Sequence, residues 1–180
     1  MKTKRYIRKG SGKHRADWWD YAFPAAYFIT ICTAGRRHYF GRVKEGRIRH
    51  TPAGAVADIC WHQIKLRRKD VYLPAFCVMP NHIHGVIRIY QEVFDSERYE
   101  EAFDPEMRWQ NIGADTISSI VGNYKAGVTR NVRRMGLGEF GWQPNFHDRI
   151  IRNEEEYDRI VNYIGENPRR WEIDRFYSRP

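Results

Sequence analysis

The order of the periodic segments constrains the fold of this chain more than any other feature. Runs rich in β-branched and aromatic residues predict strands at residues 25–33, 71–79, 82–90 and 146–151. Apolar residues at helical spacing follow Thr51 and Asp115, which predicts two amphipathic helices capped by these residues. The order strand-helix-strand-strand-helix-strand predicts an α+β fold, a ferredoxin-like antiparallel sheet with helices packed on one face.

Two further elements surround this pattern. Residues 39–43 and 47–50 predict a β-hairpin inserted after the first strand, turning on Gly46. Asn153 and the three glutamates that follow it predict a capped C-terminal helix, which should stop before Pro168. We therefore divide the chain into a basic arm at 1–20, one domain at 21–171 with an acidic insertion at 91–114, and a tail at 172–180.

The charge of the chain indicates a polyanionic partner. Its 180 residues suit a single domain, and 31 Lys and Arg against 22 Asp and Glu give a net charge of +9. Nucleic acid is favoured over a membrane, because the sequence has neither a basic amphipathic helix nor a long apolar run. Three widely spaced cysteines, in largely apolar surroundings, predict buried thiols in a reducing cytoplasm and no disulfide framework.

The segment His82-Ile83-His84 is a candidate metal site. The period-two geometry of a strand places both imidazoles on one face and puts Ile83 and Gly85 on the other. Two neutral imidazoles that share a face supply part of a metal shell and leave positions open for substrate. The spacing is equally consistent with two ordinary polar positions on a half-exposed strand.

Tyr163 and Asn167 form a second candidate pair, in the C-terminal helix. They stand at i and i+4 on the same flank of its apolar stripe, so both side chains can reach one site. Taken alone, they also fit a boundary tyrosine and an ordinary asparagine before a proline.

Five motifs in fixed order carry a resemblance to a known family. They are Tyr27-Phe28-Ile29-Thr30-Ile31-Cys32-Thr33, Met79-Pro80-Asn81-His82-Ile83-His84-Gly85, Trp142-Gln143-Pro144-Asn145-Phe146, Ile150-Ile151-Arg152-Asn153-Glu154 and Tyr163-Ile164-Gly165-Glu166-Asn167-Pro168. This series resembles the HUH-type single-tyrosine transposases, and within them the REP-associated group, from about residue 21 to residue 171.

The resemblance implies a role for each candidate residue. His82 and His84 match the family's metal-binding histidines, Tyr163 matches the nucleophile of a catalytic helix, and Asn167 matches the residue that completes the metal shell. It also implies cleavage of single-stranded DNA near hairpins, of REP-like or insertion-sequence-end type, through a 5′-phosphotyrosine. The nitrogen and amide donors suit Mg²⁺ or Mn²⁺. The active protein is expected to be a monomer or a homodimer.

Contacts to DNA are expected from basic and aromatic residues outside this group. The candidates are Arg5, Arg8, Lys9, Lys125, Arg130, Arg133, Arg134 and, as a stacking platform, Trp142. Two other functions remain open at this stage. One is a hairpin-binding module derived from a transposase that no longer cleaves, and the other is a basic ferredoxin-like RNA-binding protein.

Overall fold

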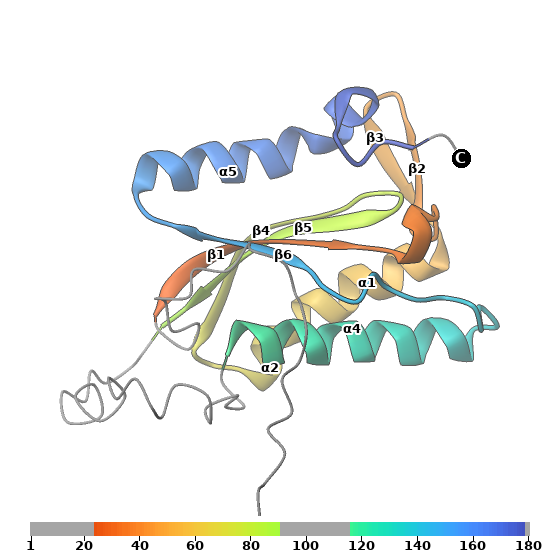
Figure 1. The fold of residues 1–180 in the computed structure, drawn as a ribbon, viewed down its shortest axis with the longest axis horizontal. Helices are drawn as coiled ribbons and strands as arrows, with labels where there is room; N and C mark the ends of the chain where they lie inside the picture. The colour runs from red at the N-terminus through yellow and green to blue at the C-terminus, as the bar shows by residue number, and fades with distance from the viewer. Residues whose placement is uncertain (1–23, 91–115, 179–180) are drawn as a thin grey trace, which may run out of the picture.

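The computed structural model describes residues 24–90 and 116–178 (Figure 1). The predictions for the basic arm, with Arg5, Arg8 and Lys9, and for the insertion at 91–114 lie outside the described residues. Four strands form one antiparallel sheet in the order β4-β5-β1-β6. Their bounds are Ala25–Cys32 for β1, Val71–Val78 for β4, His82–Ile89 for β5 and His147–Ile151 for β6.

Helices cover both faces of this sheet. Helices α1 (Pro52–His62), α2 (Ile64–Arg67) and α4 (Ile117–Arg134) lie on one face, and α5 (Glu154–Glu166) lies on the other (Figure 1). The α+β, ferredoxin-like fold predicted from the sequence is confirmed, with α1 and α4 on the shared face. The C-terminal helix is the added element, and it closes the face that the ferredoxin-like arrangement leaves open.

The alternation of residues along β5 separates the two faces of the sheet. Ile83 and Ile87 belong to the larger core with α1 and α4, whereas Val86 packs with Ile160 and Ile164 of α5. On the larger core's side of Gly85, a Cβ atom would lie 2.3 Å from Cζ2 of Trp61, so only glycine fits there. This contact holds the histidine-bearing strand close against α1.

Side-chain caps fix where the helices begin. The Thr51 hydroxyl accepts from the Gly54 amide at 3.2 Å, as the sequence predicts. The N-cap of α4 is Thr116 and not Asp115: the extended backbone of Thr116 lets its hydroxyl accept from the Ser119 amide at 3.3 Å. Either residue type can cap a helix, and the backbone turns one position later than predicted.

Reciprocal hydrogen bonds cap α5. Oδ1 of Asn153 accepts from the Glu156 amide at 2.8 Å, and Oε2 of Glu156 accepts from the Arg152 amide at 3.0 Å. The helix ends at Glu166, before Pro168, and the chain continues as the 3₁₀ helix η3 (Asn167–Ile173).

The inserted hairpin forms a separate two-stranded sheet of β2 (Gly41–Lys44) and β3 (Arg47–His50). The turn residues Glu45 and Gly46 both have positive φ, 54° and 68°, which is the backbone of a type I′ hairpin turn. A short 3₁₀ turn, η1 (Ala34–Arg36), connects the hairpin to β1. Strand β3 contacts η3, so the hairpin lies beside the end of the chain (Figure 1).

The packed part of the chain extends beyond Trp171, where the sequence analysis ended the domain. Phe176 is buried, and its ring lies 4.7 Å from the ring of His82 at a tilt of 39°. The three cysteines are free, with Cys32 and Cys60 buried and Cys77 half-buried. Among the described residues, no helix is both long and apolar enough to span a membrane.

Candidate active site

Two buried imidazoles form the centre of the site. Nε2 of His82 lies 3.1 Å from Nε2 of His84, and the two residues are 0% and 1% exposed. They stand on the face of β5 that α5 covers, because they alternate with Ile83 and Gly85 on the opposite face. In the structure, both imidazoles lie on one face of the strand, as the sequence predicts.

Hydrogen bonds orient both rings. Asn81 donates from Nδ2 to the Phe176 carbonyl and to Oγ of Ser178, at 2.9 and 3.0 Å. Its Oδ1 therefore faces His82 and accepts from Nδ1 at 2.8 Å, which leaves the Nε2 lone pair directed at His84. Nδ1 of His84 is held at 2.8 Å by the Thr30 hydroxyl. When Nδ1 of His84 donates to the Thr30 hydroxyl, Nε2 of His84 carries a lone pair, as Nε2 of His82 does. The two lone pairs then point toward each other, and a cation bound between them stabilises this arrangement.

Both histidines are neutral in the folded protein. Burial, with the charges of Arg36 and Arg175, lowers the pKa of His82 to about 3. Burial and the neighbouring imidazole hold the pKa of His84 well below its usual range. Neutral imidazole is the form that binds metal ions.

Tyr163 reaches this centre from α5. Its hydroxyl oxygen lies 3.3 Å from Nε2 of His84 and donates to Oδ2 of Asp174 at 3.0 Å. The ring meets Phe28 edge to face, with 6.1 Å between the ring centroids. Burial, followed by the Asp174 carboxylate, raises the pKa of Tyr163 to about 12, so the side chain is a phenol at neutral pH.

Asn167 supplies a buried oxygen that has no partner within the described residues. Its Nδ2 donates to Oδ2 of Asp174 at 2.9 Å, which fixes the orientation of the amide. Oδ1 is buried and accepts no hydrogen bond from the described part of the chain. A buried carbonyl oxygen in this state is a ready ligand for a cation.

Asp174 is the residue that sequence reasoning missed. One carboxylate oxygen of Asp174 and one ring nitrogen from each of His82 and His84 all lie within 4.8 Å of one another. Its Oδ1 accepts from the Phe176 amide at 2.6 Å, and its Oδ2 accepts from both Tyr163 and Asn167. Only the path of η3 brings this aspartate back over the site, and nothing in the local sequence marks it.

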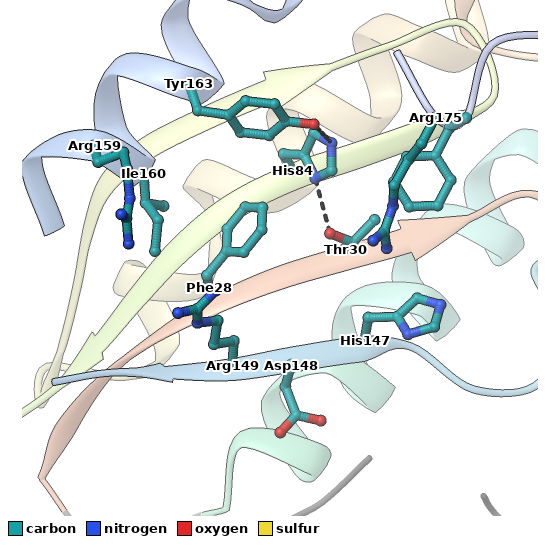
Figure 2. Close-up of a pocket in the computed structure, with 11 residues that line it drawn as sticks. Phe28, Thr30, His84, His147, Asp148, Arg149, Arg159, Ile160, Tyr163 and Arg175 are labelled. Atoms are coloured by element: carbon teal, nitrogen blue, oxygen red, sulfur yellow. Dashed lines mark hydrogen bonds between the residues drawn. The ribbon is translucent and has the colours of Figure 1, made fainter. Parts of the chain in front are cut away.

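A cavity of about 390 Å³ opens beside Tyr163. Figure 2 shows Arg159 and Arg175 on opposite sides of the tyrosine ring, with Arg149 and Asp148 on β6 below Phe28. Arg149 also pairs with Glu156 of α5, at 2.5 Å. The wall next to the hydroxyl of Tyr163 is therefore both aromatic and basic.

The basic residues predicted to contact DNA from α4 stand on a helix that lies across the sheet from α5 (Figure 1). Lys125 donates to the carbonyls of Gln143 and Pro144, and Trp142 donates from Nε1 to the Lys125 carbonyl at 3.2 Å. The Trp142 ring packs against Phe40, Tyr124 and Phe140. Trp142 is therefore half-buried and not the exposed stacking platform that was predicted. Its hydrogen bond and ring contacts hold its loop against α4.

The arginines of α4 differ from one another. Arg133 donates from Nε and Nη2 to the Phe140 carbonyl, at 3.1 and 3.0 Å, so it also holds the loop that follows the helix. Arg130, Arg133 and Arg134 are all exposed. The structure does not bring any of these residues to the candidate site.

Comparison with solved structures supports the fold. The structure described as "Structure of the REP associates tyrosine transposase bound to a REP hairpin" matches with a TM-score of 0.57 and 20% identity. The match covers 87% of this chain and 74% of that chain. At this identity it shows a shared fold. A second solved structure, from Deinococcus radiodurans R1, matches with a TM-score of 0.45 and 16% identity, over 87% of this chain and 95% of that chain.

Comparison of sequences identifies a relative. No protein-family model matches the chain. Over 163 residues, the chain is 33% identical to an uncharacterized protein of Haemophilus influenzae strain Rd, and the alignment covers 91% of each sequence. This chain therefore belongs to the same protein family as that Haemophilus influenzae protein, with a fold shared with a REP-associated tyrosine transposase.

Proposed function

We propose that this protein is a metal-dependent endonuclease and strand transferase for single-stranded DNA, of the transposase type, with Tyr163 as its nucleophile. The observation that carries the proposal is the Tyr163 hydroxyl, 3.3 Å from one of two paired imidazoles and beside a basic cavity. The solved structure that shares the fold is described as a transposase bound to a REP hairpin, which supports a DNA hairpin as the partner.

The donor set fits a divalent cation. His82 and His84 offer neutral nitrogens, Asn167 offers its unpartnered Oδ1, and Asp174 offers a carboxylate oxygen. Mixed nitrogen and oxygen donors favour Mn²⁺ or Mg²⁺ over a structural zinc ion. When bound, such an ion acts as a Lewis acid toward the scissile phosphate and favours the phenolate form of the nucleophile.

The residues of the chain account for the covalent step. Oη of Tyr163 attacks phosphorus, the bond from phosphorus to the 3′ oxygen breaks, and a 5′-phosphotyrosine and a free 3′-hydroxyl remain. The phenolic proton passes to Oδ2 of Asp174, to which it is already hydrogen-bonded, and the departing 3′ oxygen takes a proton from water. Attack of a 3′-hydroxyl on the phosphotyrosine reverses the step and rejoins a strand.

The arginines of the cavity are suited to hold the strand. Arg159 and Arg175 flank Tyr163, so they would contact phosphates on the two sides of the scissile bond. Phe28 and Phe176 line the same cavity, and the half-buried Phe28 offers a face on which an unpaired base can stack. This arrangement moves the expected DNA contact from α4 to the α5 side of the sheet.

A single experiment tests the proposal. The protein is incubated with Mn²⁺ and a 3′-labelled single-stranded DNA that carries a REP-like hairpin, and the products are separated under denaturing conditions. We expect a slowly migrating protein–DNA adduct that EDTA abolishes. If no hairpin substrate yields the adduct while the DNA still binds, the protein is a hairpin-binding module without cleavage.

A further inference from the structure

One face of the β2–β3 hairpin carries four cations. Arg42 stands opposite Arg49, and Lys44 stands opposite Arg47 in the register of the two strands. Because side chains alternate along a strand, all four project from the same face, which we call the ribbon face. All four are exposed, whereas Val43 and Ile48, on the opposite face, are half-buried.

The charges of the ribbon face are largely uncompensated. Like charges placed directly opposite each other destabilise a pair of strands. Lys44 makes only a 4.0 Å contact with Glu45, and both side chains are exposed. Within residues 24–90 and 116–178, Arg42, Arg47 and Arg49 make no ion pair. A strand pair arranged in this way is stabilised by a polyanion that lies across it.

The hairpin is adjacent to the candidate active site. Strand β3 contacts η3, and the first residue of η3 is Asn167. At the hairpin turn, a Cβ atom on Gly46 would lie 3.2 Å from Cγ of Arg169, so the turn rests on η3. Arg170, on the same 3₁₀ helix, is exposed. Positive charge therefore continues from the ribbon face toward the site.

We propose that the ribbon face binds the double-stranded stem of a DNA hairpin through its phosphates, while the single strand next to the stem enters the cavity at Tyr163. This inference rests on the proposed function for the identity of the substrate. The Cβ atoms of these residues are about 5 Å apart across the strands and about 6.6 Å apart along them, so their long side chains can reach successive phosphates of a strand.

The two surfaces differ in their side chains, and this difference suits the ribbon face to duplex DNA and the cavity to single-stranded DNA. Proteins that bind single strands combine positive charge with aromatic side chains on which bases stack. The ribbon face has cations and no aromatic residue, whereas the cavity has Phe28, Tyr163 and Phe176 beside its arginines. A two-stranded β-ribbon also matches the width of the major groove of a duplex.

The test compares two charge-matched double variants. Arg42→Gln/Arg49→Gln removes two exposed cations from the ribbon face, and Lys65→Gln/Arg67→Gln removes two exposed cations from α2. Binding of a fluorescent REP-like DNA hairpin with a single-stranded arm is measured by anisotropy in EDTA over a range of salt concentrations. We expect the slope of log affinity against log salt to fall by about 2 in the ribbon variant, at about 0.9 per phosphate contact. The α2 variant should match the wild type.

Further readouts keep this test separate from that of the proposed function. The ribbon variant should bind an unstructured single strand like the wild type, should melt no earlier, and should still form the tyrosine adduct at saturating hairpin. Absence of the adduct in the wild type, with the ribbon effect intact, overturns the cleavage proposal and supports this one. Equal losses in the two double variants, no loss in the ribbon variant, or tighter binding of an RNA hairpin of the same sequence each overturn the proposal for the ribbon face.

Discussion

The hydroxyl oxygen of Tyr163 lies 3.3 Å from Nε2 of His84, across a separation of 79 residues in the chain. Packing creates this contact: Ile160 and Ile164 of α5 bury themselves against Val86, which shares a face of β5 with His84. The apolar seam fixes the helix on the sheet, and the tyrosine on its flank then meets the imidazole. The geometry of the site thus depends on the small core beneath α5.

Replacing Tyr163 by phenylalanine should abolish strand cleavage and the covalent adduct. The change removes one hydroxyl and keeps the ring that packs on Phe28, so the fold and hairpin binding should persist. The measurement is the denaturant-resistant adduct with 3′-labelled DNA. Tyr157→Phe, on the same helix, is the matched control and should retain the adduct. An adduct formed by Tyr163→Phe would show that another residue is the nucleophile.

Replacing His84 by glutamine should weaken Mn²⁺ binding by at least about tenfold, the scale of damage to a metal shell. Isothermal titration calorimetry provides the measurement, and Asn167→Ala should show a loss of the same kind, because it removes the unpartnered Oδ1. His62→Gln is the control, since His62 is an exposed histidine on α1. Mn²⁺ affinity that is unchanged in both site variants would eliminate the metal-site hypothesis.

Replacing Asp174 by asparagine should lower the pKa of Tyr163 from about 12 toward its ordinary value of 10. The carboxylate opposes ionisation of the phenol through its charge and by accepting its hydrogen bond, and both effects disappear in the variant. Tyrosine-selective carbon NMR over a pH series measures this, with Tyr163→Phe identifying the resonance. If Asp174 accepts the phenolic proton, cleavage at neutral pH should also fall by about 10²- to 10⁴-fold. Asp158→Asn, at an exposed position on α5, should change neither quantity.

Stability of the metal-free protein should fall as the pH drops below about 6.5. Folding lowers the pKa of His82 to about 3 and that of His84 well below 6.5, so the unfolded chain binds more protons in this range. The free energy of unfolding therefore decreases as pH decreases, by about 1.4 kcal/mol per histidine for each pH unit inside the window. Urea unfolding in EDTA at several pH values measures the slope. His82→Gln/His84→Gln should have a shallower slope, and an identical slope would contradict the neutral imidazole pair.

Two glycine substitutions should change stability in opposite directions. Gly85→Ala places a Cβ atom 2.3 Å from Cζ2 of Trp61 and should destabilise the fold by about 1–3 kcal/mol. A Cβ atom added at Gly165, on α5, would have no other heavy atom within 4 Å, so Gly165→Ala should stabilise the fold by up to about 1 kcal/mol, because alanine favours the helix. Thermal and urea unfolding provide both values. A stable Gly85→Ala variant would mean that the strand and α1 can separate without loss.

The fold could be predicted from the sequence because its information is local. Period two along 82–90, helical spacing after Thr51 and the cap at Asn153 each specify an element without reference to the rest of the chain. The sequence pattern did not indicate which face of the sheet α5 would cover. That choice depends on how Ile160 and Ile164 meet the sheet, which is a property of the assembled core.

The site could be predicted only where its residues fall in recognisable motifs. His82, His84, Tyr163 and Asn167 stand in such motifs, and the structure brings them together. Asp174 stands in an ordinary polar segment, and its position depends on the turn that η3 makes after Pro168.

The sequence also did not indicate which residues hold loops in place. Lys125 and Trp142 bond to backbone groups 17 to 19 residues away, so their roles follow from the path of a loop and not from their own chemistry. Positive charge and an aromatic ring predict DNA contacts, and these contacts stay a prediction. The structure adds that both side chains hold the loop after α4 against that helix.

The position of Asp174 and Phe176 over the two imidazoles has a consequence for how the protein is made. The histidines leave the ribosome well before Tyr163, Asn167 and Asp174, and a nascent chain can pair β1, β4 and β5 while it still lacks all three. On the proposed mechanism, a chain that terminates early is an inert sheet and cannot nick DNA. The ability to cut arises only after α5 and η3 have been synthesised, when the histidine-bearing strand can already be paired with β1 and β4.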